Sequence, residues 1–309
     1  MTWTRLGRIN AAHERAVGCW YRYLYKPYYV RSPRRLLHRL AGDLTVSQVR
    51  LPWQLPIMFQ PGSIIGTQLV RTGVHDLILS ECLFRITDAK DVCVDVGANI
   101  GYTTSLLATR SGPGGRVLSF EPAPDVFGLL KRNIASWREA GVATIDAYQT
   151  ALSSAETAVM LATPAGHRGD AGGRTLESID AAIDAIRVQS STLDRAAPDR
   201  IDVLKIDVEG HEFAVLEGCE HLLRRHAIRD VVFEEHHPPP TQVTNRLAAA
   251  GYTVFRLEQG FRGPRLEADI EHEFAIYWNA PNYLATIDPV RAAHRFRSPG
   301  WRCLRLPRK

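Results

Sequence analysis

The stretch Asp91-Val92-Cys93-Val94-Asp95-Val96-Gly97-Ala98-Asn99-Ile100-Gly101 decides the fold. Its alternating apolar residues predict a buried strand, and its closely spaced glycines predict a tight turn directly afterwards. Residues 102–110 contain helix formers and no helix breaker. Strand, glycine-rich turn and helix together form the first half of a nucleotide-binding βαβ unit. In a doubly wound sheet, ligands bind beyond the carboxyl ends of the strands, which is where this turn lies.

The residues of the turn discriminate between cofactors. A dinucleotide site requires G-x-G-x-x-G, but here Asp95 stands two residues before Gly97, and Asn99 occupies the place of the second glycine. The Asp95 carboxylate would repel a pyrophosphate and would hold an ammonium group. S-adenosylmethionine has an amino acid tail and no phosphate, so we expect this cofactor rather than NAD. Asp95, Gly97, Asn99 and Gly101 are its expected contacts, although a glycine-rich turn can also be only a tight connection.

A second short strand is predicted at 116–121, and it ends in Glu121. Glu121 follows Gly97 at roughly the spacing at which an acid after the second strand binds ribose hydroxyls. The alternative is a solvated acid in a loop. Pro122 is expected to stop the strand, and Asp125 is expected to cap a helix at 126–137.

Two further buried strands are predicted, at 201–206 and 231–233, and both run into charged residues. Asp207, Glu209 and His211 follow the first strand, and Glu234 and His236 follow the second. The carboxyl ends of these strands therefore gather acids and imidazoles where a ligand is expected.

These segments resemble the FkbM-type S-adenosylmethionine-dependent methyltransferases. The matching runs, in the family's order, are VDVGANIGYTTSLLA, VLSFEPAPDVFGLLKRNI, ALSS, STLD, IDVLKIDVEGHEFAVLEG and VVFEEHHP. The resemblance covers roughly residues 91–258. It implies an α/β class I methyltransferase (Rossmann-like) fold with a seven-stranded mixed sheet in the order 3-2-1-4-5-7-6, strand seven antiparallel, and helices on both faces. It also implies O-methylation of a hydroxyl on a small natural product or on a sugar or glycolipid.

Methyl transfer to a hydroxyl requires a group that takes the acceptor's proton. The candidates for this base are, in order, His236, Asp207 and His211. Asp207 is also a candidate contact of the cofactor, while Lys205 could neutralise it in a structural ion pair. We interpret Glu209 and Glu234 as acids that contact the substrate or support the structure. Glu209 could instead bond the amides at a helix N-terminus.

No metal site is assigned, although Asp207, Glu234 and His236 are ligand types that suit a divalent cation. A non-catalytic S-adenosylmethionine-binding or interaction protein is the alternative to an enzyme. Asp95 and Asn99 disfavour an NAD-linked oxidoreductase, because neither belongs in a pyrophosphate site.

Composition bounds these interpretations. The chain has 309 residues, of which 45% are hydrophobic and 23% charged, as is ordinary for a globular protein. No apolar run approaches the ~20 residues that cross a bilayer, and charges interrupt the N-terminal stretch, so we expect a cytoplasmic protein. The five cysteines are scattered without a C-x-x-C, which disfavours a disulfide framework or a zinc site.

The formal charge of +5 is concentrated near the two ends of the chain. The near-neutral middle gives no reason to expect a specific nucleic acid partner. We expect four segments: a basic aromatic extension (1–42), a lead-in or cap (43–90), the methyltransferase domain (91–285) and a basic tail (286–309). The extension is interpreted as packing on the domain or on a dimer partner, or as binding an anionic membrane surface.

Several elements are expected around the motifs. Edge strands are predicted at 43–50 and 57–65, one helix at 66–85, and strand three at 142–151. Helices are predicted at 213–226 and 241–251, strand six at 252–258, and strand seven at 274–279. The glycine-rich stretch 162–178 is either a surface insertion or a lid over the substrate.

Overall fold

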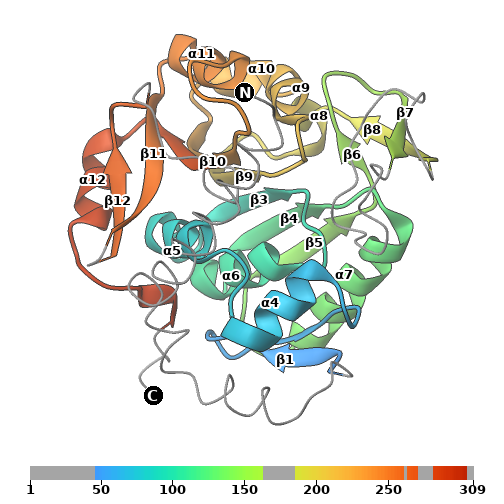
Figure 1. Ribbon diagram of the computed structural model, residues 1–309. Helices are drawn as coiled ribbons and strands as arrows, with labels where there is room; N and C mark the ends of the chain where they lie inside the picture. Colours follow the sequence, from blue (N-terminus) through green and yellow to red (C-terminus); the bar gives the residue numbers. More distant parts are fainter. Residues whose placement is uncertain (1–45, 163–184, 261–262, 271–280, 305–309) are drawn as a thin grey trace, which may run out of the picture.

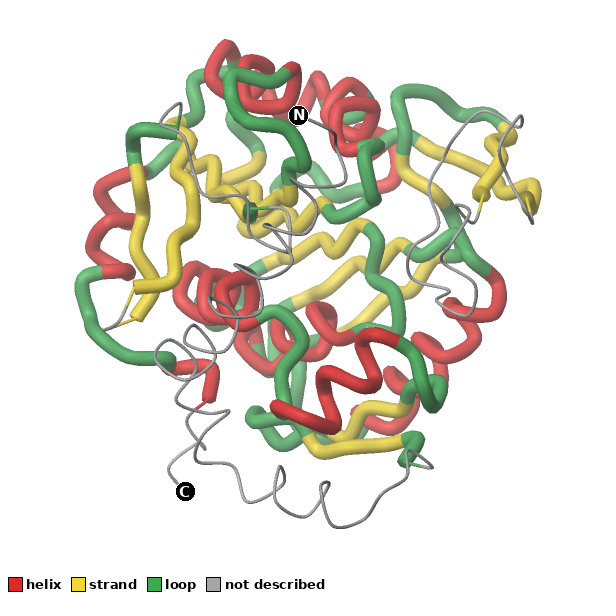
Figure 2. The backbone as a smooth tube through the Cα atoms, viewed as in Figure 1, coloured by secondary structure: helices red, strands yellow, loops and turns green. Residues whose placement is uncertain are grey.

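A computed structural model describes residues 46–162, 185–260, 263–270 and 281–304. Figure 1 shows a central sheet with helices on both faces, and Figure 2 shows the same arrangement by secondary structure. The expected extension, the strand at 274–279 and nearly all of the stretch 162–178 lie outside the described residues.

The described strands are β1 (Gln48–Arg50), β2 (Pro56–Met58), β3 (Val92–Val96), β4 (Arg116–Phe120), β5 (Thr144–Tyr148), β6 (Ala151–Leu152), β7 (Ala158–Ala162), β8 (Ala185–Ser191), β9 (Ile201–Ile206), β10 (Ile228–Glu234), β11 (Thr253–Gly260), β12 (Gly263–Glu267) and β13 (Asn282–Thr286). The described helices are α4 (Ile64–Thr72), α5 (Leu77–Ile86), α6 (Tyr102–Ser111), α7 (Pro124–Trp137), α8 (Leu193–Ala196), α9 (Glu212–Glu217), α10 (Glu220–Arg224), α11 (Gln242–Ala249) and α12 (Pro289–Phe296), with a short 3-10 turn at Arg302–Leu304.

The main sheet has eight strands in the order β12-β11-β13-β10-β9-β3-β4-β5. The neighbours from β10 to β5 pair in parallel, whereas β13 is antiparallel to both β10 and β11. Read from β5, this is the expected order 3-2-1-4-5-7-6 with an antiparallel strand seven, so the predicted fold class is confirmed. β12 adds an eighth strand beyond strand six. The seventh position is filled by β13, not by the aromatic run at 274–279.

Successive residues of the central strands face two different hydrophobic cores. Cys93 and Val203 belong to the core covered by α4 to α7, whereas Val94 and Leu204 belong to the core covered by α8 to α11. Figure 1 shows these two groups of helices on opposite sides of the sheet. Burial on both faces is why the strands read as nearly continuous apolar runs.

The lead-in segment packs against the helices that follow the glycine turn. The indole of Trp53 donates to Ser105 Oγ of α6 at 3.0 Å, and that of Trp137 in α7 donates to the Pro56 carbonyl at 2.6 Å. The helix predicted at 66–85 is two helices, because Gly73 (φ +80°) ends α4 and the Asp76 side chain caps α5.

Three further local predictions are corrected. Asp125 does not cap α7, which begins one residue earlier at Pro124, a residue whose fixed φ suits the first helical position. The helix predicted at 213–226 is divided into α9 and α10 at Gly218. A Cβ on Gly218 would lie 2.0 Å from the Ser153 carbonyl oxygen. Strand three is shorter than predicted, because the chain leaves the main sheet after Tyr148 and enters the small sheet β6-β8-β7.

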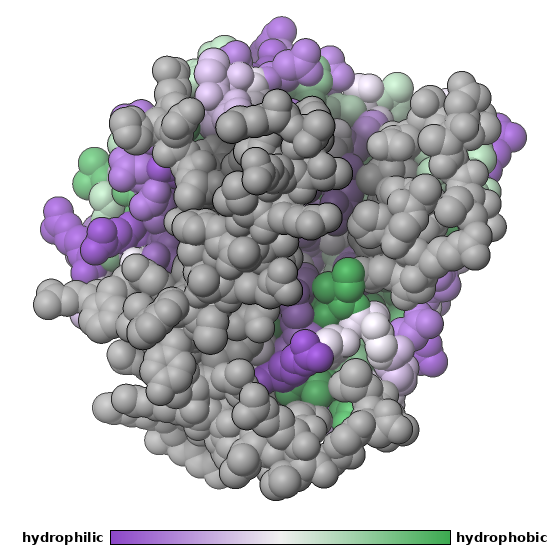
Figure 3. All heavy atoms as spheres, in the orientation of Figure 1, coloured by the Kyte–Doolittle hydropathy of each residue, from purple (hydrophilic) through white to green (hydrophobic). Residues whose placement is uncertain are grey.

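Part of the expected basic tail is integrated into the fold. α12 packs against α5, and the buried guanidinium of Arg85 donates to the carbonyls of Arg295, Ser298 and Gly300. Among the described residues, no helix is both long and apolar enough to cross a membrane. On the face drawn in Figure 3, hydrophobic and hydrophilic residues lie side by side over α4, whose Ile64 is 52% exposed.

Candidate active site

The glycine turn after β3 has the conformation that its sequence predicts. Gly97, Asn99 and Gly101 have φ values of +72°, +50° and +92°. A Cβ on Gly97 would lie 1.9 Å from the Asp207 carbonyl oxygen. The turn after β3 therefore touches the turn after β9 directly, and only glycine fits there.

Asp95 lies deeper than its position at the strand tip suggests. Its side chain is fully buried. One carboxylate oxygen accepts hydrogen bonds from the hydroxyls of Thr103 (2.8 Å) and Thr104 (2.6 Å), and the other lies 3.1 Å from Lys205 Nζ. Through these contacts Asp95 supports the turn. Its contact with a ligand's ammonium group stays a prediction.

Glu121 lies beside the turn with both oxygens engaged. Oε2 accepts from the Asn99 backbone N–H and Oε1 from that of Ala123, each at 2.9 Å. Burial raises the pKa of Glu121 to about 7, against the lowering effect of the two backbone bonds. Each carboxylate oxygen keeps a second lone pair. Hydrogen bonds from two ribose hydroxyls to Glu121 stay a prediction, and the position of its carboxylate suits them.

Sequence reasoning overlooked Tyr148 at the end of β5. The residue is 37% exposed, its ring stacks on Phe120 at a centroid distance of 5.0 Å, and its carbonyl accepts from the Glu121 N–H. It therefore presents an aromatic edge next to Glu121. Because the predicted strand ran on to residue 151, no sequence signal marked Tyr148 as a strand end.

The acids and one imidazole after β9 and β10 come together. The side chains of Asp207, Glu209 and His236 are 34%, 40% and 41% exposed, and His236 Nε2 lies 3.9 Å from Glu209 Oε2. The pKa of Glu234 is raised to about 9, first by burial and then by the charges of Asp207, Asp76 and other acids. These groups form one acidic cluster beside the glycine turn.

His211 is not part of this group. Its Nε2 lies 2.9 Å from Ser153 Oγ, and burial lowers the pKa of its imidazole. Glu212 at the start of α9 bonds the turn before it, since its Oε1 accepts from the N–H groups of Val208 and Gly210. Bonding of helix N-terminal amides by Glu209 stays a prediction. His211 therefore ties the turn after β9 to the small sheet.

The lead-in segment reaches the acidic cluster, a contact that the sequence did not indicate. Asn282 of β13 is directly opposite Glu234 of β10, and its side-chain amide donates to Asp76 Oδ2 at 3.0 Å. Asp76 Oδ1 accepts from the Leu79 N–H at the start of α5. A capping pattern could have located Asp76, but its contact with a residue 206 positions away could not be read from the sequence.

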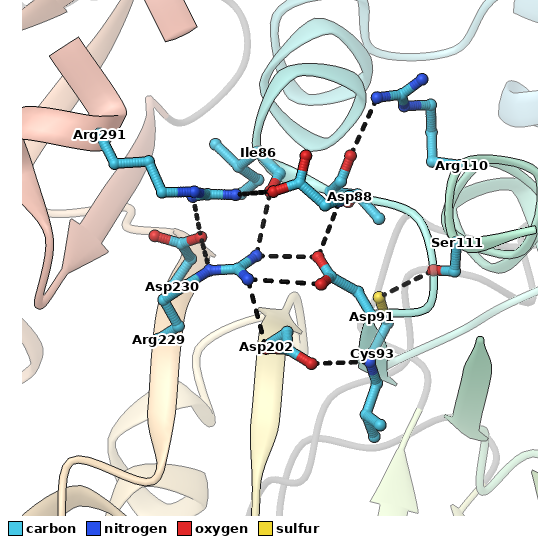
Figure 4. Close-up of polar contacts among 12 residues, drawn as sticks. Ile86, Asp88, Asp91, Cys93, Arg110, Ser111, Asp202, Arg229, Asp230 and Arg291 are labelled. Atoms are coloured by element: carbon cyan, nitrogen blue, oxygen red, sulfur yellow. Dashed lines mark hydrogen bonds and ion pairs between the residues drawn. The ribbon is translucent and has the colours of Figure 1, made fainter. Parts of the chain in front are cut away.

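The amino ends of the same strands carry a second charged cluster (Figure 4). Arg229 contacts three carboxylates, those of Asp91 (2.9 Å), Asp202 (3.2 Å) and Asp230 (2.9 Å). Arg291 of α12 adds contacts with Asp230 (3.0 Å) and Asp88 (2.7 Å). Every carboxylate of this cluster has an arginine partner, as expected of a structural support.

Within the described part of the chain, no three His, Cys, Asp or Glu side chains are grouped so that they could hold a metal ion. Asp207, Glu234 and His236 therefore do not form a ready set of ligands.

The family model described as Methyltransferase FkbM domain matches residues 95–262, more than half of the chain. The chain belongs to this family. The match begins at Asp95 and includes the glycine turn, Glu121 and the ends of β9 and β10. The matched range therefore includes the residues of the acidic cluster described above.

Named relatives agree with the assignment to the FkbM family. The chain is 29% identical to the hexuronic acid methyltransferase AglP of Haloferax volcanii over 58% of this chain and 69% of that protein. It is 33% identical to the 31-O-demethyl-FK506 methyltransferase FkbM of Streptomyces tacrolimicus, over 53% of this chain and 73% of that protein. The structural match to a solved methyltransferase FkbM from Methylobacillus flagellatus covers 63% of this chain and 43% of that chain. The sequence identity is 16% and the TM-score is 0.43.

As an FkbM methyltransferase the chain depends on S-adenosylmethionine, and its residues fit this cofactor. Gly97 and Gly101, with φ values of +72° and +92°, hold the turn in the tight conformation that such a site needs. Glu121 offers acceptors for ribose hydroxyls, and the partly exposed Asp207 offers a negative charge to an ammonium group. When bound, the cofactor supplies an electrophilic methyl group on its sulfonium.

Proposed function

We propose that this FkbM methyltransferase methylates a hydroxyl group of a small natural product or of a sugar or glycolipid. The observation that carries this proposal is the acidic cluster after β9 and β10, in which His236 lies 3.9 Å from Glu209, and Asp207 and Glu209 both act on Glu234. A hydroxyl acceptor needs a base within hydrogen-bonding reach, and this cluster contains such groups. The names of two relatives support the choice, since one specifies an O-methyl group and the other a hexuronic acid.

We assign the base role to His236. Its imidazole accepts the acceptor's proton, and Glu209, 3.9 Å away, stabilises the imidazolium that results. Asp207 is a weaker candidate, because its carboxylate already faces Lys205 Nζ at 3.6 Å. His211 is the weakest, because it is bonded to Ser153.

Glu234 has a different role in this proposal. With a pKa raised to about 9 by burial and neighbouring acids, its carboxyl group keeps its proton at neutral pH. A neutral carboxyl group can donate a hydrogen bond to an oxygen of the acceptor. In this proposal the acidic cluster contains a proton acceptor, His236, and a hydrogen-bond donor, Glu234, for a polyhydroxylated molecule.

The test uses cofactor with a labelled methyl group and an extract from the cell of origin, followed by identification of the labelled product. With that acceptor, His236→Gln should lower kcat by about a hundredfold or more, the range for loss of a general base. Binding of S-adenosylhomocysteine should not change. His237→Gln is the matched control, because the neighbouring His237 side chain is 83% exposed.

Two results would overturn the proposal. Full turnover by His236→Gln would remove the assigned base, and a label found on nitrogen or carbon would remove the O-methyl assignment. A chain that binds S-adenosylhomocysteine but labels nothing would favour the alternative of a non-catalytic cofactor-binding protein.

A further inference from the structure

Lys205 is a buried cation between the turn after β3 and the acids at the ends of β3 and β9. Its side chain is 2% exposed. Its Nζ donates to the carbonyls of Gly97 (2.7 Å) and Val96 (3.1 Å), and it lies 3.1 Å from Asp95 and 3.6 Å from Asp207. One ammonium group thus joins the turn after β3 to the acids of two neighbouring strands.

The two turns that Lys205 joins are also in direct contact. The Asp207 N–H donates to the Val96 carbonyl at 3.2 Å, and the Asp207 carbonyl oxygen occupies the space of the missing Gly97 Cβ. A shift of Lys205 would therefore move the cofactor's backbone cradle and Asp207 together.

The charges around Lys205 do not balance. Two carboxylates face one ammonium, which leaves one negative charge in excess. Asp95 is fully buried and its other oxygen is bonded to Thr103 and Thr104, so it has no surface to offer a ligand. Asp207 has the longer contact with Lys205 and a side chain that is 34% exposed. The excess charge is therefore accessible at Asp207.

We propose that Lys205 is a positioning residue that withdraws Asp95 from ligand binding and leaves Asp207 as the carboxylate that receives the ammonium group of S-adenosylmethionine. Lys205 and Asp95 then act as a neutral buried pair. The inference rests on dependence on this cofactor and not on the identity of the acceptor.

The test compares two probes by isothermal titration with the full chain. S-adenosylhomocysteine carries the amino acid tail, whereas 5′-methylthioadenosine has the same adenosine and thioether without it. The ratio of their affinities isolates the tail, because damage to the fold or to the nucleoside site lowers both affinities together.

Asp207→Asn removes the excess negative charge, so the affinity ratio should fall by about tenfold or more while methylthioadenosine binding stays within about twofold. Asp95→Asn leaves Asp207 as the one carboxylate facing Lys205, so the excess negative charge is neutralised and the ratio should fall similarly. Adding Lys205→Met to Asp95→Asn removes the whole pair, so the ratio should return to within about threefold of the wild-type value.

The double variant separates this proposal from its rival. If Asp95 itself holds the tail, Lys205→Met cannot restore the ratio, and the proposal is overturned. An unchanged ratio in Asp207→Asn, or wild-type protein that binds both probes equally, would also overturn it. Should Asp95→Asn fail to fold, the Asp207→Asn ratio decides alone, since that side chain is partly exposed.

Failure of this inference can be told apart from failure of the proposed function. A wrong acceptor class leaves the affinity ratios unchanged, because no acceptor is present in the titration. A wild-type chain that binds neither probe would overturn the cofactor assignment and this inference together.

Discussion

The two ends of β3, β9 and β10 bury charge in opposite ways. At the amino ends, every carboxylate of the cluster in Figure 4 is within 3.2 Å of an arginine nitrogen. At the carboxyl ends, Lys205 faces two carboxylates, and Glu121 and Glu234 have no cationic side chain at such a distance among the described residues. With Arg295 on Asp88 and Arg200 on Asp202, four arginines face four carboxylates, so the first arrangement balances its charges. The second leaves an excess of acids.

The pKa shifts follow this difference. Burial acts to lower the pKa of Arg229, but hydrogen bonds and charges of Asp91 and Asp230 raise it overall. At the other end, burial raises the pKa of Glu121 to about 7 and that of Glu234 to about 9. Balanced charges hold the strands together, and unbalanced ones are available to a ligand.

The largest expected effect comes from breaking the balanced end. Arg229→Leu leaves three buried carboxylates without their shared partner, so the free energy of unfolding should fall by about 3–5 kcal/mol. Urea denaturation measures this loss, and methyl transfer per folded molecule should be unchanged. Arg225→Ala is the control, because its contact with Asp199 is exposed and 3.9 Å long, and no measurable change is expected. Equal losses in both variants would contradict a structural role for the balanced cluster.

The next effect is a pH dependence at the acidic end. The folded pKa of Glu234, about 9, exceeds the ordinary value of 4.5, so its contribution to stability is fully present below about pH 4.5 and is lost as pH rises through 9. Between about pH 7 and 9, wild type should lose about 2–3 kcal/mol relative to Glu234→Gln. Denaturation at several pH values measures the difference.

Asp88→Asn is the matched variant at the balanced end. Burial acts to raise the pKa of Asp88, but the bonds and charges of Arg291 and Arg295 lower it overall. Its contribution to stability is therefore lost only in acid, and the cost of this substitution should be constant between about pH 7 and 9. A slope in this range for Asp88→Asn, or none for Glu234→Gln, would contradict the comparison.

The smallest effect concerns Glu121. An ionised carboxylate accepts hydroxyl hydrogen bonds better than a neutral one, and the pKa of Glu121 is about 7. The affinity for S-adenosylhomocysteine should therefore rise by about five- to tenfold from about pH 6 to about pH 8. Glu121→Gln should bind more weakly and lose this dependence. Asp146→Asn serves as a control, because Asp146 pairs with Arg116 at the surface; a pH dependence that survives in Glu121→Gln would exclude Glu121 as its source.

The features near the glycine turn could be predicted because they are local in the sequence. The φ values at Gly97 and Gly101, and the place of Glu121 beside them, follow from spacing within one βαβ unit. The burial of Asp95 could not be predicted, because it depends on Lys205, which arrives from a different strand.

The surroundings of the acidic cluster depend on contacts that join segments far apart in the sequence. Asp76 and Asn282 meet across 206 positions, and no local pattern marks either as part of a site. Strand seven was misplaced for a related reason. The aromatic run at 274–279 has strand composition, but pairing with β10 and β11, which local composition does not specify, selects Asn282–Thr286.

The most direct measurement is a crystal structure of the chain with S-adenosylhomocysteine. The account predicts ribose hydroxyls on Glu121, the ammonium group on Asp207, and no ligand atom in contact with Asp95. A ligand bound at the arginine-rich end, or an ammonium group seated on Asp95, would contradict it.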